Sequence, residues 1–116
     1  MLSILIPTYN YNVYPLVDEL KNQADSIGIS YEILVQDDAS SLFLSQNAQI
    51  NLLQNCHYKL NIENLGRGNN INLLNASAKY NYVLLMEADA LPQKKTYLKD
   101  LILAINEIKK DSKIIS

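Results

Sequence analysis

The sequence predicts an α/β fold in which helices cover both faces of a mostly parallel sheet. Apolar runs that suit buried strands alternate along the chain with segments of helical periodicity, which is typical of βαβ units. Short acidic segments follow two of these runs, at Asp37-Asp38 and at Glu87-Ala88-Asp89. Ligands of open parallel sheets bind at the carboxyl ends of the strands. We therefore expect a three-layer, Rossmann-like domain with a binding site at that edge of the sheet.

The first βα unit occupies the first 28 residues. Leu2 to Ile6 is a short apolar strand, which we expect Pro7 to end because proline has no backbone N–H for the sheet. Pro15 suits the first position of the helix that follows. Apolar residues then recur at helical spacing as far as Gly28, where glycine favours a helix end.

A second strand and a weaker helix come next. Tyr31 to Gln36 is the strand, and Ser40 or Ser41 is expected to cap a helix whose apolar residues lie between positions 44 and 53. A third strand is predicted within Tyr58 to Ile62. The segment therefore supplies two further strands of the sheet.

The second half of the chain adds a turn, two helices and a fourth strand. The turn at Asn64 to Gly68 leads into a helix with Leu74 on its apolar face, and Asn81 to Met86 is the strand. The longest helix is predicted from about Lys94 to Lys110, and Lys113 to Ser116 resembles the opening of another strand. A strand that opens at the end of the sequence indicates a truncated domain, so we expect residues 1–116 to form one partial domain. For a Rossmann-like sheet of four strands we expect the strand order 3-2-1-4.

Composition excludes several classes of function. The chain has 116 residues, 48% of them hydrophobic and 19% charged, as expected for one soluble globular domain. Its formal charge of −2 gives no basic surface for nucleic acid. No apolar run reaches the roughly 20 residues of a membrane span. The lone Cys56 excludes an intrachain disulfide and a cysteine-built zinc site, so we expect a reducing, cytoplasmic setting.

Four blocks along the chain match one protein family in order and spacing. They are Ser-Ile-Leu-Ile-Pro-Thr-Tyr-Asn at 3–10, Asp-Asp-Ala-Ser at 37–40, Asn64-x-Gly66 followed by Asn72, and Glu-Ala-Asp at 87–89. The sequence therefore resembles the family-two glycosyltransferases, which have the GT-A fold. The resemblance covers nearly the whole chain but only the nucleotide-binding half of the family's domain.

The resemblance implies a base pocket at the ends of the first two strands. Pro7 would line it through its backbone together with Thr8, and Tyr9 would stack on the base. Asp38 would accept a hydrogen bond from the base, most naturally from an imino N–H of uracil or guanine. Asp37 is the better candidate for a structural role. From the residues alone, the first segment also suits a strand-ending turn and the acidic pair a helix cap.

The resemblance also implies a metal site at the end of the fourth strand. Asp89 would coordinate Mg²⁺ or Mn²⁺ that bridges two phosphates, and Ala88 would line the nucleotide site. Glu87 departs from the aspartate that is usual at its position, although it could still reach the cation, a sugar hydroxyl or a bound water. Two carboxylates separated by one residue on an extended segment would point the same way. Solvated loop carboxylates are the alternative.

The turn before the third helix faces the nucleotide and donor sugar in the family. Gly66 would allow a backbone geometry or a close approach that a side chain blocks. Arg67 would pair with a phosphate, or would be an ordinary solvated arginine at a helix start. Asn72 would face the donor or cap a turn. Cys56 and His57 lack the spacing of metal ligands, so we assign them no chemistry.

The implied activity is transfer from a nucleotide-diphospho-sugar, a UDP- or GDP-sugar, to an unknown saccharide or lipid-linked glycan, with inversion at the anomeric carbon. The carboxylate general base of the family comes from a later segment, so no catalytic residue is assigned here. The alternative is a non-catalytic nucleotide-sugar-binding module. A receiver domain is disfavoured because the acidic pair that it needs after the first strand is missing. A nucleotidyltransferase is disfavoured because the Gly-rich basic loop usual at that place is missing. Bacterial polysaccharide biosynthesis is expected by family association only.

Overall fold

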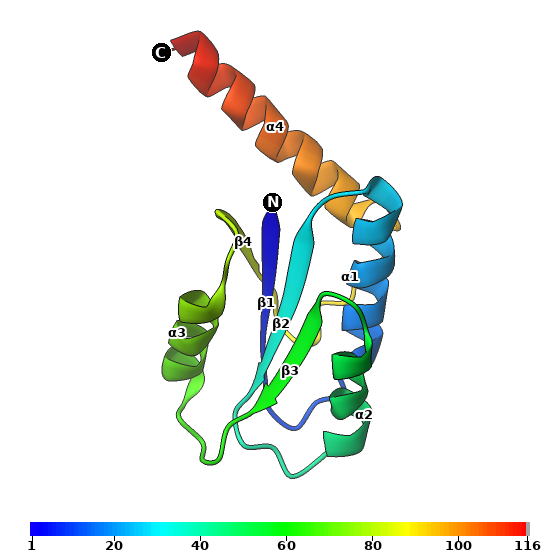
Figure 1. Cartoon of the computed structure of the whole chain (residues 1–116), viewed down its shortest axis with the longest axis vertical. Coiled ribbons are helices and arrows are strands. Elements are labelled where there is room, and N and C mark those ends of the chain that lie inside the picture. The colour runs from blue at the N-terminus through cyan, green and yellow to red at the C-terminus, as the bar shows by residue number, and fades with distance from the viewer. Residues whose placement is uncertain (116) are drawn as a thin grey trace.

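Four parallel strands form the sheet, in the order β3-β2-β1-β4 (Figure 1). The computed structural model describes residues 1–115. The strands are β1 (Leu2–Thr8), β2 (Tyr31–Asp37), β3 (Cys56–Leu60) and β4 (Tyr82–Leu85), and the helices are α1 (Tyr14–Ile27), α2 (Leu44–Ala48), α3 (Arg67–Ser77) and α4 (Tyr97–Ile115), with a 3₁₀ turn η1 (Gln49–Leu52) after α2. The predicted α/β class and the predicted strand order are both confirmed.

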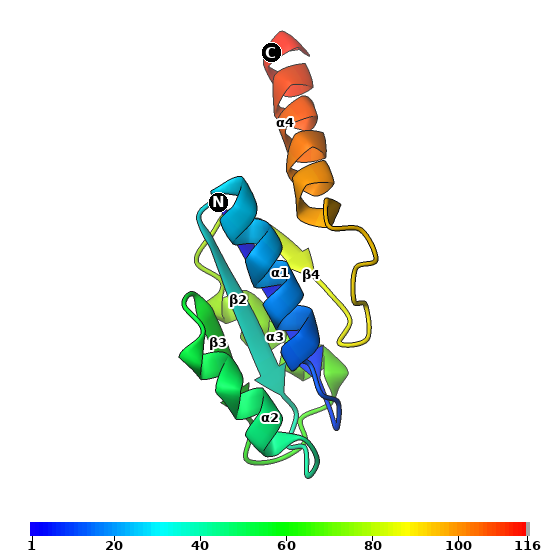
Figure 2. The same ribbon diagram turned by 90° about the vertical axis from the view of Figure 1, so that its right-hand side faces the viewer.

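Helices cover both faces of the sheet, which gives the three layers expected (Figure 2). Side chains alternate along a strand, so the two faces draw on alternate residues. Ile4 and Ile33 lie in the larger core cluster with residues of α1, whereas Leu5 and Leu34 form a smaller cluster with Leu74 of α3. Burial on both faces explains the unbroken apolar runs at the centres of β1 and β2, Ile4 to Ile6 and Ile33 to Val35.

Pro7 does not end the first strand, which continues to Thr8. Leu5 accepts a hydrogen bond from the Met86 N–H on the β4 side of β1. Pro7, two residues later, faces the same side, beyond Leu85 where β4 has already ended. Its missing N–H therefore costs no hydrogen bond of the sheet.

The second helix begins later than predicted, at Leu44 rather than after Ser40 or Ser41. The Ser40 backbone N–H and hydroxyl both donate to the Asp37 carboxylate instead, which closes a tight turn after β2. The prediction was wrong because Ser40 is bound to Asp37 at the end of β2, so Ser40 is not available to cap a helix. The third strand begins at Cys56, two residues before the predicted segment.

The last helix extends beyond the sheet (Figure 1). Leu98 is fully buried and Leu101 and Ile102 pack against the core, but Leu103 and Ile108 are 55% and 66% exposed, so α4 packs on the rest of the chain mainly through its first turns. Residues 113–115 continue α4, so they do not open the predicted fifth strand, and Ser116 lies outside the described residues. Within residues 1–115 no helix is long and apolar enough to span a membrane.

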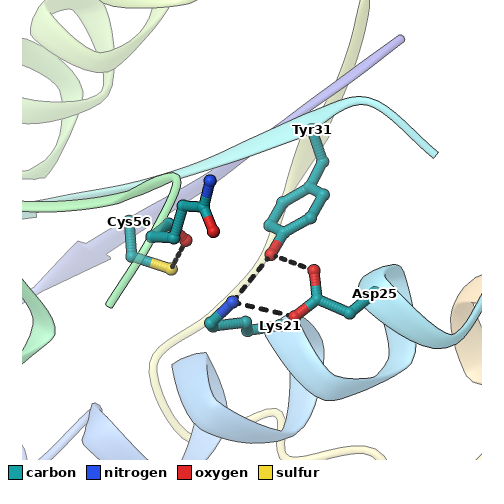
Figure 3. A network of polar contacts seen from close by, with 5 residues as sticks. Lys21, Asp25, Tyr31 and Cys56 are labelled. Carbon is teal, nitrogen blue, oxygen red and sulfur yellow. Dashed lines mark hydrogen bonds and ion pairs between the residues drawn. The ribbon is translucent and has the colours of Figure 1, made fainter. Parts of the chain in front are cut away.

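A polar network joins α1 to the start of β2, at the end of the sheet opposite the predicted site (Figure 3). The Lys21 ammonium lies 2.8 Å from Asp25 Oδ2, and the Tyr31 hydroxyl donates to Asp25 Oδ1 at 2.7 Å. Burial, and then the bond to Asp25, raise the pKa of Tyr31. Cys56 lies nearby, buried, and its burial raises the thiol pKa to about 11, so the thiol is a packing group.

Candidate functional site

A cavity of about 430 Å³ opens at the carboxyl edge of the sheet. It is formed by the ends of β1, β2 and β4 and by the start of α3. Nine of the residues that the sequence nominated line it, whereas Asn72 does not. The nine are Pro7, Thr8, Tyr9, Asp38, Gly66, Arg67, Glu87, Ala88 and Asp89. Three further residues complete the lining: Tyr11, Asn64 and Asn70. The structure thus brings together segments that are as much as 82 positions apart in the sequence.

Asp38 ties the loop before α3 to the end of β2. The residue is 5% exposed, and its carboxylate accepts the backbone N–H of Leu65 at 2.7 Å and that of Gly66 at 3.0 Å. Asn61 donates to the same oxygen as Leu65, at 3.2 Å. Oδ2 thus carries one hydrogen bond, and since a carboxylate oxygen can accept two, it keeps capacity for one more. The sequence did not predict this structural role of Asp38.

An amide network lies beneath the cavity. Asn70 is 1% exposed and donates to the Gln36 carbonyl at 2.9 Å, while its own oxygen accepts from Asn61 at 2.8 Å. The Gln36 side chain donates in turn to Asn61 at 2.6 Å. The sequence analysis missed these residues. The sequence does contain a signal for Asn70, because it lies four positions before Leu74 and therefore on the same, buried face of α3.

Asp37 has the structural role expected of it. It is fully buried, and besides Ser40 its carboxylate accepts the Tyr58 hydroxyl from β3. Burial, and then this hydrogen bond, raise the pKa of Tyr58. Asp37 therefore holds the turn that places Asp38 at the cavity.

The loop after β1 is fixed by contacts with the segment after β2. Asn10 has a φ of 50°, and its side-chain oxygen accepts the N–H groups of Ser41 and Leu42 at 2.9 and 3.2 Å. Asn47 of α2 donates to the Tyr11 carbonyl at 2.9 Å. These contacts leave the Tyr9 ring 56% exposed at the cavity. An exposed ring on a fixed loop is suited to stacking against a flat ligand.

Thr8 carries a buried hydroxyl with no hydrogen-bond partner within the described residues. The residue is 5% exposed and lies at the cavity wall. Leaving a buried hydroxyl without a partner costs about 1–3 kcal/mol. Such groups are rare in native proteins, so the Thr8 hydroxyl is a candidate to bind a ligand at the cavity.

Gly66 is required for its backbone conformation. Its φ is 88°, and a Cβ built on it would meet no atom within 4 Å. Of the two reasons that the sequence offered, backbone geometry therefore applies and close approach within the chain does not. Asn72 lies within α3, is exposed and does not line the cavity, so neither role expected for it is supported.

Arg67 is paired with Glu87 across the cavity wall. Arg67 Nη1 donates to Glu87 Oε2 at 3.0 Å, and Nη2 contacts the other carboxylate oxygen. The two side chains are 55% and 56% exposed. The sequence had offered a phosphate partner or solvent for Arg67, and a cation, a sugar hydroxyl or a bound water for Glu87. It did not foresee that the two residues would bind each other.

The acidic segment after β4 is a turn. The Ala90 N–H donates to the Glu87 carbonyl at 3.1 Å, which closes residues 87–90. The expectation that Glu87 and Asp89 share an extended strand was therefore wrong, although both line the cavity. Asp89 is exposed and takes part in none of the three ion pairs of the described residues.

The donor set fits a cation that a ligand helps to hold. No cluster of three or more His, Cys, Asp or Glu residues able to bind a metal exists within the described residues. Mg²⁺ in phosphate sites is typically held by one or two carboxylates together with phosphate oxygens and water. The cavity carries three carboxylates against one guanidinium, Arg67. A diphosphate would therefore enter an acidic site, and a divalent cation would offset that charge.

The family model described as Glycosyl transferase family 2 matches residues 3–115. No curated protein matches the sequence. The crystal structure of S. aureus TarS 1–349 is 26% identical with a TM-score of 0.68, and the match covers 91% of this chain and 32% of that one. The same protein in complex with UDP-GlcNAc is 28% identical with a TM-score of 0.67, covering 91% and 31% of the two chains.

The mannosyltransferase PcManGT from Pyrobaculum calidifontis, in complex with GDP-Man and Mn²⁺, shares the fold. It is 21% identical with a TM-score of 0.64, over 84% of this chain and 30% of that one. The chain thus spans about a third of the length of these solved structures. The family model covers nearly every residue of the chain. The chain therefore belongs to glycosyl transferase family 2.

Proposed function

We propose that the chain is the donor-binding part of a glycosyltransferase that takes a UDP- or GDP-sugar together with Mn²⁺ or Mg²⁺. The observation that carries this proposal is the convergence of the nine nominated residues on one cavity at the carboxyl edge of the sheet. A solved relative is bound to UDP-GlcNAc and a more distant one to GDP-Man and Mn²⁺, which supports testing both bases.

The base would bind beside Tyr9. The exposed ring offers a stacking face, and the backbone of Pro7 and the hydroxyl of Thr8 lie on the same strand end. Asp38 Oδ2 has one acceptor position left, which suits an imino N–H of uracil or guanine. The same three N–H donors that hold Asp38 would also fix the direction of that hydrogen bond.

The diphosphate would bind between the start of α3 and the turn after β4. Asp89 is the carboxylate free to hold the cation, Arg67 offers a guanidinium for a phosphate, and Ala88 lines the wall between them. A bound divalent cation would act as a Lewis acid that offsets charge on the departing nucleoside diphosphate. These residues would bind and orient the donor.

No catalytic base is assigned within this chain. Asp38 is tied to backbone N–H groups, Glu87 to Arg67, and Asp89 is the proposed cation ligand. Inverting transfer needs a further carboxylate to deprotonate the acceptor hydroxyl. The inverting stereochemistry, the glycan acceptor, a bacterial polysaccharide pathway and a cytoplasmic setting are proposals from family membership, the last also from the lone buried cysteine.

A non-catalytic nucleotide-sugar-binding module is the second candidate. The observation that favours it is that two of the three cavity carboxylates, Asp38 and Glu87, are already bound within the chain, while the third, Asp89, is the proposed cation ligand. Both candidates predict the same donor binding. They differ in whether UDP or GDP is released from a UDP- or GDP-sugar when an acceptor is supplied.

Calorimetric titration of UDP and GDP, each with and without Mn²⁺, tests the proposal. We expect one of the two to bind in a manganese-dependent way, and we expect UMP or GMP to lose that dependence because each lacks the second phosphate. Asp89→Asn provides the matched control, since it removes the charge and keeps the side-chain shape. A folded chain that binds neither diphosphate with Mn²⁺ present would refute the proposed donor site.

A further inference from the structure

Arg67 and Glu87 are bound to each other at the place where the proposed donor would need each of them. The guanidinium reaches across from α3 to the turn after β4 and meets the carboxylate with both arms. Both side chains line the cavity. We propose that Arg67 and Glu87 form a placeholder pair, which means that they bind each other in the free protein. When a metal-bound nucleoside diphosphate enters, Arg67 would bind a phosphate and Glu87 the cation.

The exchange has a low cost because each partner receives an equivalent replacement. Both side chains are more than half exposed, and water screens the attraction between them. A guanidinium fork binds phosphate oxygens in the same two-armed geometry that it uses for a carboxylate. A carboxylate released in this way suits a hard divalent cation. The inference rests on the proposed function, since it names what displaces the pair.

The Arg67–Glu87 pair also determines which charges are exposed in the cavity of the free protein. While Arg67 is bound, it offsets the charge of Glu87, and Asp38 is occupied by amide donors. Asp89 is then the one cavity carboxylate without a partner among the described residues. One exposed carboxylate holds a divalent cation weakly. The cation and the diphosphate would therefore bind well together and poorly apart.

This arrangement gives Arg67 opposite effects on two measurable affinities. Arg67→Gln would release Glu87 and so tighten the binding of Mn²⁺ alone. The same change would remove a phosphate partner and so weaken the binding of Mn²⁺ with UDP or GDP. An effect of about fivefold in each direction is expected, which corresponds to the upper range for an exposed ion pair.

The test is a titration of Mn²⁺ alone, followed by calorimetry with the diphosphate and Mn²⁺, on the whole chain. Lys95→Gln is the matched control, because Lys95 is an exposed cation paired with Glu19 at 2.9 Å away from the cavity lining. The double variant Arg67→Gln/Glu87→Gln should lose the gain in Mn²⁺ affinity. Thermal denaturation of each variant checks that the fold is intact.

The outcomes separate this inference from the proposed function. Unchanged or weaker binding of Mn²⁺ alone by Arg67→Gln would overturn the placeholder, as would a gain that persists in the double variant or appears in Lys95→Gln. Unchanged affinity for the diphosphate with Mn²⁺ would also overturn it, because Arg67 would then not contact phosphate. If the parent chain binds neither UDP nor GDP with Mn²⁺, the donor site itself is refuted and the exchange with it.

Discussion

The carboxylate of Asp38 accepts the backbone N–H of Gly66 at 3.0 Å, across 28 positions of the sequence. The same carboxylate accepts the N–H of Leu65, so one buried charge fixes two successive peptide groups at the start of α3. Gly66 takes a φ of 88° there, and the chain enters α3 at the next residue, directly after the two bound N–H groups. The wall of the cavity therefore depends on Asp38 before any ligand binds.

Asp38→Asn should lower both stability and nucleotide affinity. An amide has one acceptor oxygen, so it cannot accept from Leu65 and Gly66 in the present geometry, and its NH₂ would face a backbone N–H. The loss of a hydrogen bond to a charged acceptor costs about 1.5–3 kcal/mol. Urea unfolding and UDP or GDP titration measure the two effects. Loss of affinity with unchanged stability would assign Asp38 to the ligand and not to the loop.

The arrangement of elements followed from the sequence because burial imposes a clear pattern. β1 and β2 lie between two helical layers, so each carries a fully apolar run at its centre, Ile4 to Ile6 and Ile33 to Val35, and the acidic segments after strands place the site at one edge. Strand order 3-2-1-4 came from the fold class and is the one observed. Nine of the nominated residues lie at one cavity for the same reason, since each lies at or after the end of a strand, or at the start of a helix, at that edge.

Interactions between loops could not be predicted in the same way. Arg67 and Glu87 belong to elements 20 positions apart, and no periodicity states that their side chains meet. The start of α2 was misplaced because Ser40 bonds Asp37, a choice that depends on local geometry. In both cases a polar side chain has several possible partners, and the tertiary structure determines which one it binds.

Thr8→Val should stabilise the free protein and weaken nucleotide binding. Valine keeps the shape of threonine while it removes a buried hydroxyl without a partner, so unfolding should cost about 1 kcal/mol more. A ligand that uses the hydroxyl would bind less tightly to the same variant. Chemical unfolding and calorimetry measure the opposed signs. Thr8→Ser keeps the hydroxyl and is the control, and a fall in stability for Thr8→Val would show that the hydroxyl has a partner in the free protein.

Stability at alkaline pH should depend on Tyr31. Burial, and then the hydrogen bond to Asp25, raise the pKa of Tyr31 above its ordinary value of 10.0, so the folded state favours the neutral phenol. This contribution is fully present below pH 10 and is lost as the pH rises through the higher folded-state pKa. Tyr58 contributes in the same direction, since its pKa is raised as well.

Tyr31→Phe should therefore flatten, without abolishing, the loss of stability above about pH 10. The acid side should remain, because the Lys21 hydrogen bond is the largest cause that lowers the pKa of Asp25. The Asp25 contribution is present above its ordinary pKa of 3.8 and is lost as the pH falls through the lower folded-state value. Urea unfolding across the pH range measures both sides. An unchanged alkaline slope would contradict the role of Tyr31.

Asp89→Ala should abolish manganese-dependent nucleotide binding and leave the fold nearly unchanged. The side chain is exposed and pairs with no cation among the described residues, so its loss should change the free energy of unfolding by less than about 0.5 kcal/mol. For a chain of this size that is a shift of less than about 4 °C in Tm. Calorimetry with Mn²⁺ and thermal denaturation together separate the two effects. A large fall in Tm would make Asp89 a structural residue. Full retention of metal-dependent binding would instead assign the cation to Glu87, which would then be the functional carboxylate of the turn after β4.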